Sequence, residues 1–388
     1  MTVQRSLGHS LAPEDKMLLR FGDFRMDQRP DRLNDLANRL RNAFSKETLT
    51  FSCPSSPLSI VGRDDRFWQP AEDFILTRRG RRLVFTKDCH RADIILLHNF
   101  GEVSDIFQYL QTNNYNSLFC VWMHDNHIGS FQDTARNCDI FFPCHFVNYR
   151  DMENEISLRG PVVPDYTRNI DLDLTKSCID NADYMYEKSK VVAQYFIYNN
   201  FPRNRHLYAL TQDDVFRCYF ASQEDRVEFY WDLSEQEKNR RWGMYKSSIV
   251  VPVHKDISTR IFDGLAWGHT VIVPDTIDGF ERVFPQAVQD ELSIVRYAAN
   301  APLRDVVVTA HKALALFDQG GIEKARARHQ FIAKHHTYEN RLTDIFLFLE
   351  DLFHGNEKIV VSRAGNAMKI SCEREIIRDF SQLASSGL

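Results

Sequence analysis

Cationic and hydroxyl side chains stand between an apolar run and a short helical pattern. The run 248–253 consists largely of branched apolar residues, and the polar side chains that follow it include His254, Lys255, Ser258 and Arg260. With Ser258 or Thr259 as N-cap, a helix would begin here and end at Gly268. A helix N-terminus offers free N–H groups and partial positive charge to a phosphate. The pattern predicts an anion site, to which Arg203 and Arg205 on a neighbouring turn would add charge; the alternative is an ordinary strand–helix–strand unit.

An acidic side chain ends the aromatic run Val227–Asp232, just before a polar helix start at Ser234. A carboxylate at the carboxyl end of a strand, with Tyr230 and Trp231 beside it, can attack an anomeric carbon and form a covalent intermediate. The alternative is that Asp232 caps the following helix. Asp232 is therefore the candidate nucleophile, and Tyr230 is a candidate residue lining the site.

Histidine residues lie at or just after the carboxyl ends of three expected strands. His98 ends one, His124 and Asp125 follow the next, and His145 follows a third. Open α/β sheets bind ligands beyond the carboxyl ends of their strands, so these residues predict one wall of an acceptor site. We expect a general base among His98, His124 and Asp125. The alternative for each histidine is a structural hydrogen bond.

Two patterns that could bind metal have other interpretations. Asp171-Leu172-Asp173 is a D-x-D pattern of the kind that can hold Mg²⁺, but Arg168 and Lys176 flank it and no apolar strand precedes it. We interpret it as a solvated segment. The eight cysteines are scattered without a C-x-x-C pair, so zinc is not expected. We expect no metal and no other cofactor.

The segment Arg260–Gly268, with the sequence RIFDGLAWG, resembles the donor-site helix of GT-B glycosyltransferases, usually R-x-x-E-A-x-A-x-G. The similarity extends upstream to 195–205 and 244–248, and downstream to 291–297 and 335–341. The resemblance implies an α/β fold of two Rossmann-like domains that face a cleft, with C-terminal helices packing back toward the first domain. It also implies that Asp263 binds the ribose hydroxyls of a donor nucleotide.

Many members of that family have a glutamate eight positions upstream of the ribose-binding acid, where this chain has Lys255. A cation there suits a sugar with its own carboxylate, although Lys255 could also be a solvent-facing loop residue. With an enclosed Asp232, the chain resembles the bacterial retaining β-Kdo transferases, which transfer β-Kdo from CMP-β-Kdo to O-antigen chains. The resemblance implies an aspartyl–glycosyl intermediate, no metal, and these donor contacts: Arg203, Tyr230, His254, Lys255, Ser258, Arg260 and Asp263.

Three other functions remain open. The first is a retaining GT-B enzyme that uses a UDP- or GDP-sugar, with Lys255 on the diphosphate. The second is a sugar-nucleotide 2-epimerase, which shares the two-domain fold. The third is a non-catalytic nucleotide-sugar-binding module of a larger assembly enzyme. Nucleotide preference, product analysis and donor turnover distinguish these functions.

The elements that position these residues alternate between strand and helix patterns, as in parallel sheets covered by helices. A length of 388 residues favours two domains. We expect an acceptor domain over 1–178, a donor domain over 179–340, and a returning helix with a small extension over 341–388. Strands are expected at 82–86, 93–98, 117–123, 140–142, 194–198, 216–220, 227–231, 248–253, 270–273 and 292–297. Helices are expected at 31–44, 103–111, 131–136, 179–190, 303–317, 322–334 and 338–353. Residues 48–80 should be irregular, and 358–361 with 367–371 should form a hairpin.

Composition gives no sign of a nucleic-acid partner. The net charge is −5, and no long basic block occurs. No signal peptide and no apolar run of membrane-spanning length is present. The sequence predicts a cytoplasmic protein that meets the inner membrane through its acceptor. The expected partners are a nucleotide sugar, a polysaccharide or glycolipid acceptor, and further domains of a longer polypeptide.

Overall fold

The computed structural model describes residues 15–20, 31–53, 70, 73–98, 112, 116–124, 138–147, 157–168, 170–181, 186–198, 201–221, 233–364 and 367–385. The chain divides into two compact units. The first comprises Met1–Cys144, Asn148–Val163 and Thr343–Ile377, and the second comprises His145–Val147, Pro164–Leu342 and Arg378–Leu388. Each unit contains one sheet.

The first unit is built on a ten-stranded sheet in the order β1-β14-β15-β8-β7-β6-β5-β2-β4-β3. Pairing is parallel from β15 to β4, and antiparallel between β1 and β14, β14 and β15, and β3 and β4. The strands are β1 (Asp15–Arg20), β2 (Thr48–Ser52), β3 (Ile75–Arg78), β4 (Arg81–Phe85), β5 (Ile94–His98), β6 (Leu118–Met123), β7 (Ile140–Pro143), β8 (Leu158–Arg159), β14 (Lys358–Ala364) and β15 (Ala367–Cys372).

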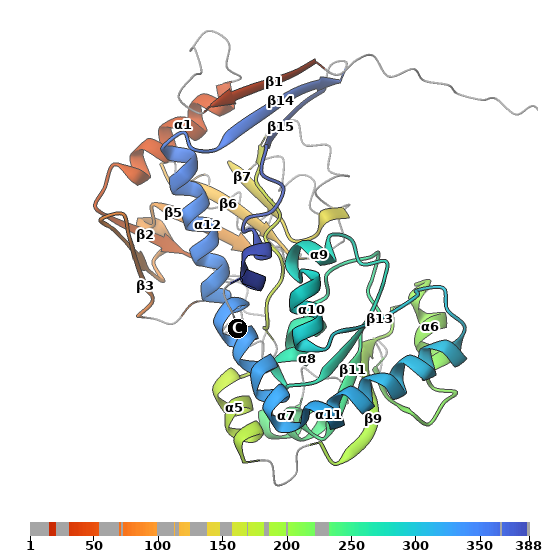
Figure 1. The fold of residues 1–388 in the computed structure, drawn as a ribbon. Helices are drawn as coiled ribbons and strands as arrows, with labels where there is room; N and C mark the ends of the chain where they lie inside the picture. Colours follow the sequence, from red (N-terminus) through yellow and green to blue (C-terminus); the bar gives the residue numbers. More distant parts are fainter. Residues whose placement is uncertain are drawn as a thin grey trace, which may run out of the picture. The chain divides into compact units, whose positions relative to one another are not determined.

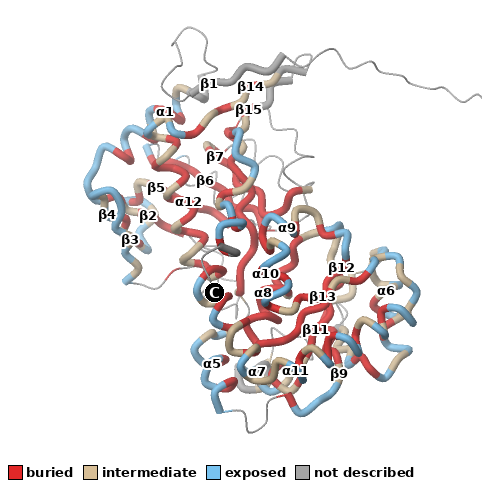
Figure 2. Tube along the Cα trace, viewed as in Figure 1, coloured by how far each residue is buried: buried red, intermediate tan, exposed pale blue. Residues whose placement is uncertain are grey.

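The central strands β5, β6 and β7 are buried along their whole length (Figure 2). Their apolar residues do not alternate with polar ones, as is typical of parallel strands covered on both faces. Helix α1 (Asp31–Phe44) packs on β6, and helix α12 (Tyr338–Phe353) places Phe346 against Phe51 of β2, with ring centroids 4.8 Å apart. The division between the units falls within α12, between Leu342 and Thr343, so most of this helix belongs to the first unit.

The second unit contains five parallel strands in the order β10-β9-β11-β12-β13. They are β9 (Lys188–Phe196), β10 (Phe216–Ala221), β11 (Tyr245–Ile249), β12 (Thr270–Pro274) and β13 (Val295–Tyr297). The helices are α5 (Leu172–Asp180), α6 (Arg203–Leu210), α7 (Glu235–Gly243), α8 (Thr259–Ala266), α9 (Phe280–Val283), α10 (Gln286–Leu292) and α11 (Leu303–His335). Helices α8 and α11 pack on β12 (Figure 1).

The predicted α/β fold of two Rossmann-like units is confirmed. The predicted helices at 31–44 and 338–353 are present, and the two at 303–317 and 322–334 form one helix, α11, with a kink at Gly321. The hairpin near the C-terminus is also present, and it extends the sheet of the first unit. The predicted strand at 227–231 and helices at 103–111 and 131–136 lie outside the described residues.

Three predictions about elements were wrong. The helix expected at 179–190 is absent, because α5 ends at Asp180 and β9 begins at Lys188, where pairing with β11 extends the strand beyond its apolar residues. Residues 48–80 are not wholly irregular, since they contain β2 and β3. The strand expected at 248–253 begins earlier and ends at Ile249, because the chain then leaves the sheet to form a turn.

Among the described residues, no helix is long and apolar enough to cross a membrane.

Candidate functional site

The strand order of the second unit reverses between β9 and β11. β9 pairs with β10 on one side and with β11 on the other, and all three are parallel. At such a reversal the connections leave toward opposite faces of the sheet, and ligands bind beyond the carboxyl ends of the two strands. The residues that follow Phe196 and Ile249 therefore form the candidate site.

A tight turn with two left-handed residues connects β11 to α8. The N–H of Asp256 donates to the carbonyl of Val253 at 3.1 Å, and φ is +49° at His254 and +67° at Lys255. These are the features of a type I′ turn. A left-handed conformation costs a residue with a side chain about 1–2 kcal/mol, and the N–H of Asp278 holds the turn by donating to the Lys255 carbonyl at 3.0 Å. The turn exposes both the His254 and the Lys255 side chains, as the predicted positive rim requires.

Ser258 is the N-cap of α8, as predicted. Its side-chain oxygen accepts a hydrogen bond from the N–H of Arg260 at 3.4 Å. At the other end of the helix Gly268 has φ +75°, and a Cβ there would lie 2.7 Å from the Cβ of Ala325. The local sequence thus fixes both ends of this short helix. Its N-terminus, which carries partial positive charge, lies at the turn between β11 and α8.

Two arginines lie over the ring of Tyr195 at the end of β9. The guanidinium carbon is 5.4 Å from the ring centroid for Arg203 and 4.6 Å for Arg260. The buried Tyr195 hydroxyl donates to the Ile249 carbonyl at 2.8 Å and accepts from the N–H of Val251 at 2.7 Å. This tyrosine therefore joins the ends of β9 and β11 and supports both cations.

Each arginine also donates to a backbone carbonyl of the β9 strand. Arg203 donates through Nη2 to Phe196 and Arg260 through Nε to Gln194, both at 2.8 Å. Arg203 is the first residue of α6, so it lies on a helix and not on the turn expected from the sequence. Burial and the neighbouring Arg260 lower the pKa of Arg203 below its ordinary value. The two cations are held in place and remain near each other despite their repulsion.

Asp256 is the acid of this cluster, and the sequence analysis did not select it. Burial raises the pKa of its carboxyl to about 7, against the opposing effect of Arg203 and Arg260. Its Oδ1 and the Nε of Arg203 are buried and have no hydrogen-bond partner among the described residues. Buried polar atoms without partners are rare, and a ligand or water commonly satisfies them. The sequence signal that could have found Asp256 is a single acid within a run of cations at the predicted anion site.

Asp263, predicted to bind ribose, is buried in the middle of α8. Its Oδ1 accepts from the hydroxyl of Thr167 at 3.0 Å and from the N–H of Arg168 at 3.2 Å. The hydroxyl of Thr259 donates to the Tyr166 carbonyl at 3.0 Å and binds the same segment. Asp263 therefore has a structural role in holding residues 166–168 on α8, and ribose binding stays a prediction.

In the first unit, two of the predicted histidines lie together. His98 ends β5 and His124 follows the neighbouring parallel strand β6, and Nδ1 of His98 lies 2.9 Å from Nε2 of His124. Both are buried, and Trp122 lies beside them with its ring centroid 4.1 Å from that of His124. The carboxyl ends of adjacent strands bring the two rings into hydrogen-bond contact, as the sequence analysis expected.

Three predicted site residues, Tyr230, Asp232 and Asp125, lie outside the described residues. Asp171 of the D-x-D pattern is the N-cap of α5, where its carboxylate accepts from the N–H of Leu174 at 3.0 Å. This capping role accounts for the pattern without a ligand.

No protein-family model matches the chain, and a search of the curated proteins finds no match. Solved structures do match. A sucrose-phosphate synthase from Thermosynechococcus elongatus aligns with a TM-score of 0.46 and 11% identity, over 82% of this chain and 92% of that one. The catalytic domain of starch synthase IV from Arabidopsis thaliana, bound to ADP and acarbose, aligns with a TM-score of 0.43 and 10% identity, over 79% and 99%. An α1,3-fucosyltransferase aligns with a TM-score of 0.38 and 12% identity, over 76% and 92%. Likeness at this level says nothing about the substrate of this chain.

Proposed function

We propose that the protein is a glycosyltransferase of the GT-B kind that binds a nucleotide sugar at the carboxyl ends of β9 and β11. The observation that carries the proposal is the convergence of Arg203, Arg260 and Asp256 at the point where the strand order reverses. Two fixed cations and the N-terminus of α8 attract a phosphate. A buried acid among them can accept a hydrogen bond from a hydroxyl of the ligand.

The proposed donor is CMP-β-Kdo, which carries one phosphate and one sugar carboxylate. The fixed pair Arg203 and Arg260 suits the phosphate, because a guanidinium offers several N–H donors in a rigid plane. The exposed Lys255 suits the carboxylate, because it extends from a turn of fixed geometry and has no ion pair with another described residue. A donor with a single phosphate does not require a metal, so the proposed reaction is metal-independent.

The proposed mechanism is a double displacement with retention. The Asp232 carboxylate attacks the anomeric carbon and forms an ester while the bond to the CMP oxygen breaks, so CMP leaves with the electron pair. An acceptor hydroxyl then loses its proton to a base and attacks the same carbon, which releases Asp232 as a carboxylate. The base is sought among His98, His124 and Asp125. Two inversions at one carbon give the β-glycoside.

The proposed acceptor is the end of a bacterial surface polysaccharide of the O-antigen kind, or a glycolipid that carries it. The protein would then work in the cytoplasm, at the cytoplasmic face of the inner membrane when the acceptor is lipid-linked. Other domains of a longer polypeptide could supply additional contacts to the acceptor.

Mass spectrometry of the intact protein tests the covalent step. Wild-type protein given CMP-Kdo without acceptor should gain the mass of one Kdo residue, and peptide mapping should place it on Asp232. Asp232→Asn keeps the size of the side chain but removes its charge, so it should gain no mass and its turnover should fall by several orders of magnitude. An adduct on another residue, or near-normal transfer by Asp232→Asn, would exclude this role.

A thermal-shift panel tests the donor class. A ligand that binds only the folded state raises the unfolding midpoint, so CMP should raise it more than UDP, GDP or CDP at equal concentration. A larger shift with UDP or GDP would instead support a retaining transferase with a diphosphate donor, in which Lys255 contacts the diphosphate. Interconversion of sugar nucleotides without transfer would support a 2-epimerase.

A further inference from the structure

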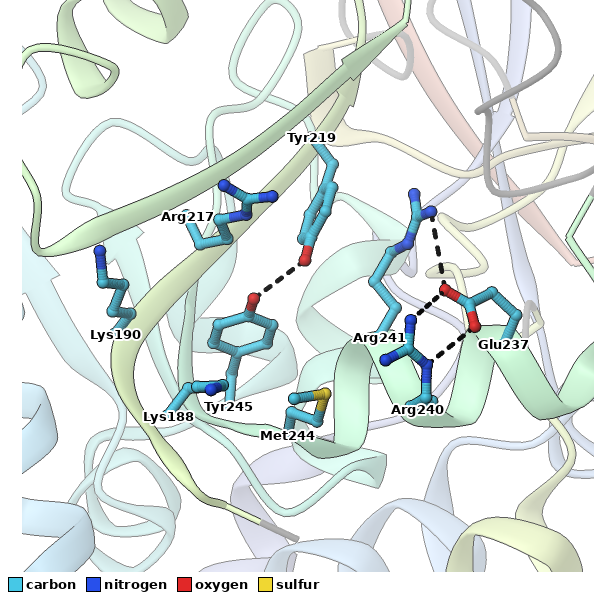
Figure 3. Close-up of a pocket in the computed structure, with 9 residues that line it drawn as sticks. All are labelled: Lys188, Lys190, Arg217, Tyr219, Glu237, Arg240, Arg241, Met244 and Tyr245. Carbon is cyan, nitrogen blue, oxygen red and sulfur yellow. Dashed lines mark hydrogen bonds and ion pairs between the residues drawn. The ribbon is translucent and has the colours of Figure 1, made fainter. Parts of the chain in front are cut away.

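A cavity of about 440 Å³ lies in the second unit, toward the opposite end of β9 from the candidate donor site. Figure 3 shows the nine residues that line it: Lys188, Lys190, Arg217, Tyr219, Glu237, Arg240, Arg241, Met244 and Tyr245. Lys188 and Tyr245 are the first residues of β9 and β11, whereas the donor site follows the last residues of these strands. At about 3.3 Å per residue, Lys188 at the start of β9 lies about 26 Å from Phe196 at its end.

Strand periodicity explains why cations gather here. Lys188 and Lys190 are two residues apart on β9, and Arg217 and Tyr219 are two residues apart on β10, so each pair projects from one face of its strand. β9 and β10 are paired neighbours. The second unit therefore presents three cationic side chains from two adjacent strands on the cavity wall.

The charges of the cavity are not balanced. Glu237 is its only carboxylate among the described lining residues. It binds Arg240 with two contacts of 2.9 Å and lies 4.0 Å from Arg241. Lys188, Lys190 and Arg217 form no ion pair with any described residue. Three positive charges are left for a ligand.

Two tyrosines form an ordered polar wall between these cations and α7. The hydroxyls of Tyr219 and Tyr245 lie 2.9 Å apart, and burial together with this bond raises the pKa of Tyr245 above 10. The guanidinium carbons of Arg217 and Arg241 lie 5.0 and 4.5 Å from the Tyr219 ring centroid. Stacking on a ring restrains the orientation of a guanidinium.

We propose that this cavity is a second binding site, for a small molecule that carries a diphosphate or a comparable pair of phosphate groups. A volume of 440 Å³ is within the range of small-molecule pockets. Three cations without ion-pair partners match a compact polyanion better than a single carboxylate, and arginine binds phosphate oxygens through paired N–H bonds. The proposal does not depend on the sugar-transfer reaction.

Isothermal titration with inorganic pyrophosphate tests the proposal on the full chain. Wild-type protein should bind it, and Lys190→Gln and Arg217→Gln should each weaken binding about tenfold, because each removes a charged hydrogen-bond donor. Lys312→Gln is the matched control, since Lys312 is exposed on α11 of the same unit. Arg260→Gln reports any binding at the donor site, because Arg203 and Arg260 are the residues proposed to hold the phosphate there. Thermal unfolding of each variant checks that it is folded. Lys190→Gln should leave the unfolding midpoint nearly unchanged, because the Lys190 side chain makes no polar contact with a described residue.

The expected pattern is a loss with Lys190→Gln and Arg217→Gln, and wild-type affinity with Lys312→Gln. Three outcomes would overturn the proposal: no binding by the wild type at millimolar pyrophosphate, equal losses in Lys312→Gln and the cavity variants, or a loss confined to Arg260→Gln. The last would place the pyrophosphate at the donor site.

Discussion

His98 and His124 share a hydrogen bond of 2.9 Å between Nδ1 and Nε2, although 26 residues separate them in the chain. In such a bond one nitrogen donates and the other accepts, so at least one of the two must be unprotonated. The pair is buried at the ends of two adjacent parallel strands. When both rings are neutral, the second nitrogen of the donating ring is unprotonated, and such a nitrogen in a fixed position is the group that a general base requires.

Replacement of either histidine by glutamine should therefore affect the reaction more than donor binding. We expect kcat to fall about 10²–10⁴-fold if one ring takes the proton of the acceptor hydroxyl. The dissociation constant of the donor, measured by calorimetry, should change little. His90→Gln is the control, since His90 is exposed in the same unit. A kcat within a few-fold of wild type for both His98→Gln and His124→Gln would assign the pair a structural role.

The contact between Asp263 and Thr167 predicts an effect on stability. Asp263→Ala leaves the hydroxyl of Thr167 and the N–H of Arg168 without their acceptor, so the free energy of unfolding should fall by about 1–3 kcal/mol. Urea unfolding measures this change. Asp290→Ala, on the exposed side of α10, should change stability much less.

Nucleotide binding then separates the two roles of Asp263. Thr167→Val removes the same side-chain contact but leaves the carboxylate, so it should lower stability and keep nucleotide affinity. If Asp263→Ala and Thr167→Val weaken nucleotide binding equally, the carboxylate acts only by holding residues 166–168.

Local patterns predicted the short elements around the donor site well. The polar Ser258 before an amphipathic run and Gly268 after it define α8 within one residue, because caps act through neighbouring backbone groups. The cations of the turn were also found, since their number and spacing are visible in one segment. For Asp263 the sequence predicts ribose binding, which stays a prediction, and its contact with Thr167 was not expected, because the two residues are 96 positions apart.

What the sequence could not predict depends on tertiary packing. The raised pKa of Asp256 results from burial, which outweighs the opposing effect of Arg203, a residue supplied by a helix after a different strand. β9 extends back to Lys188 because Tyr245 of β11 pairs with it, and not because the residues Lys188-Ser-Lys are typical of a strand. The same extension places Lys188 and Lys190 in the cavity of the second unit, which no linear motif indicates.

Lys255 should discriminate between the intact donor and its nucleotide. If its ammonium binds the sugar carboxylate, Lys255→Ala should weaken binding of CMP-Kdo more than binding of CMP, by about tenfold for one charged hydrogen bond. Lys246→Ala is a control for the loss of a cation, since Lys246 is paired with Asp318 on another part of the unit. Equal losses for both ligands would place Lys255 on the phosphate and remove the argument for an acidic sugar.

Asp256 should make stability depend on pH near neutrality. Its carboxyl has a pKa of about 7 in the folded protein, raised by burial from an ordinary value of 3.8. Between these two values the folded state binds more protons than the unfolded state, so the free energy of unfolding falls as pH rises from 3.8 to about 7. Above pH 7 the loss is complete, because the carboxylate is then charged in both states.

Asp256→Asn isolates this contribution, since an amide has similar size and does not ionise in this range. The difference in unfolding free energy, wild type minus Asp256→Asn, should decrease as pH rises from 5 to 8 and then level off. Asp290→Asn, which changes an exposed carboxyl of the same unit, is the control for the substitution itself. Because a neutral Asp256 leaves the charges of Arg203 and Arg260 uncompensated, wild-type affinity for CMP should also rise below pH 7, and Asp256→Asn should keep the higher affinity up to pH 8. Parallel stability curves for wild type and Asp256→Asn would show that the carboxyl titrates normally and is hydrated in solution.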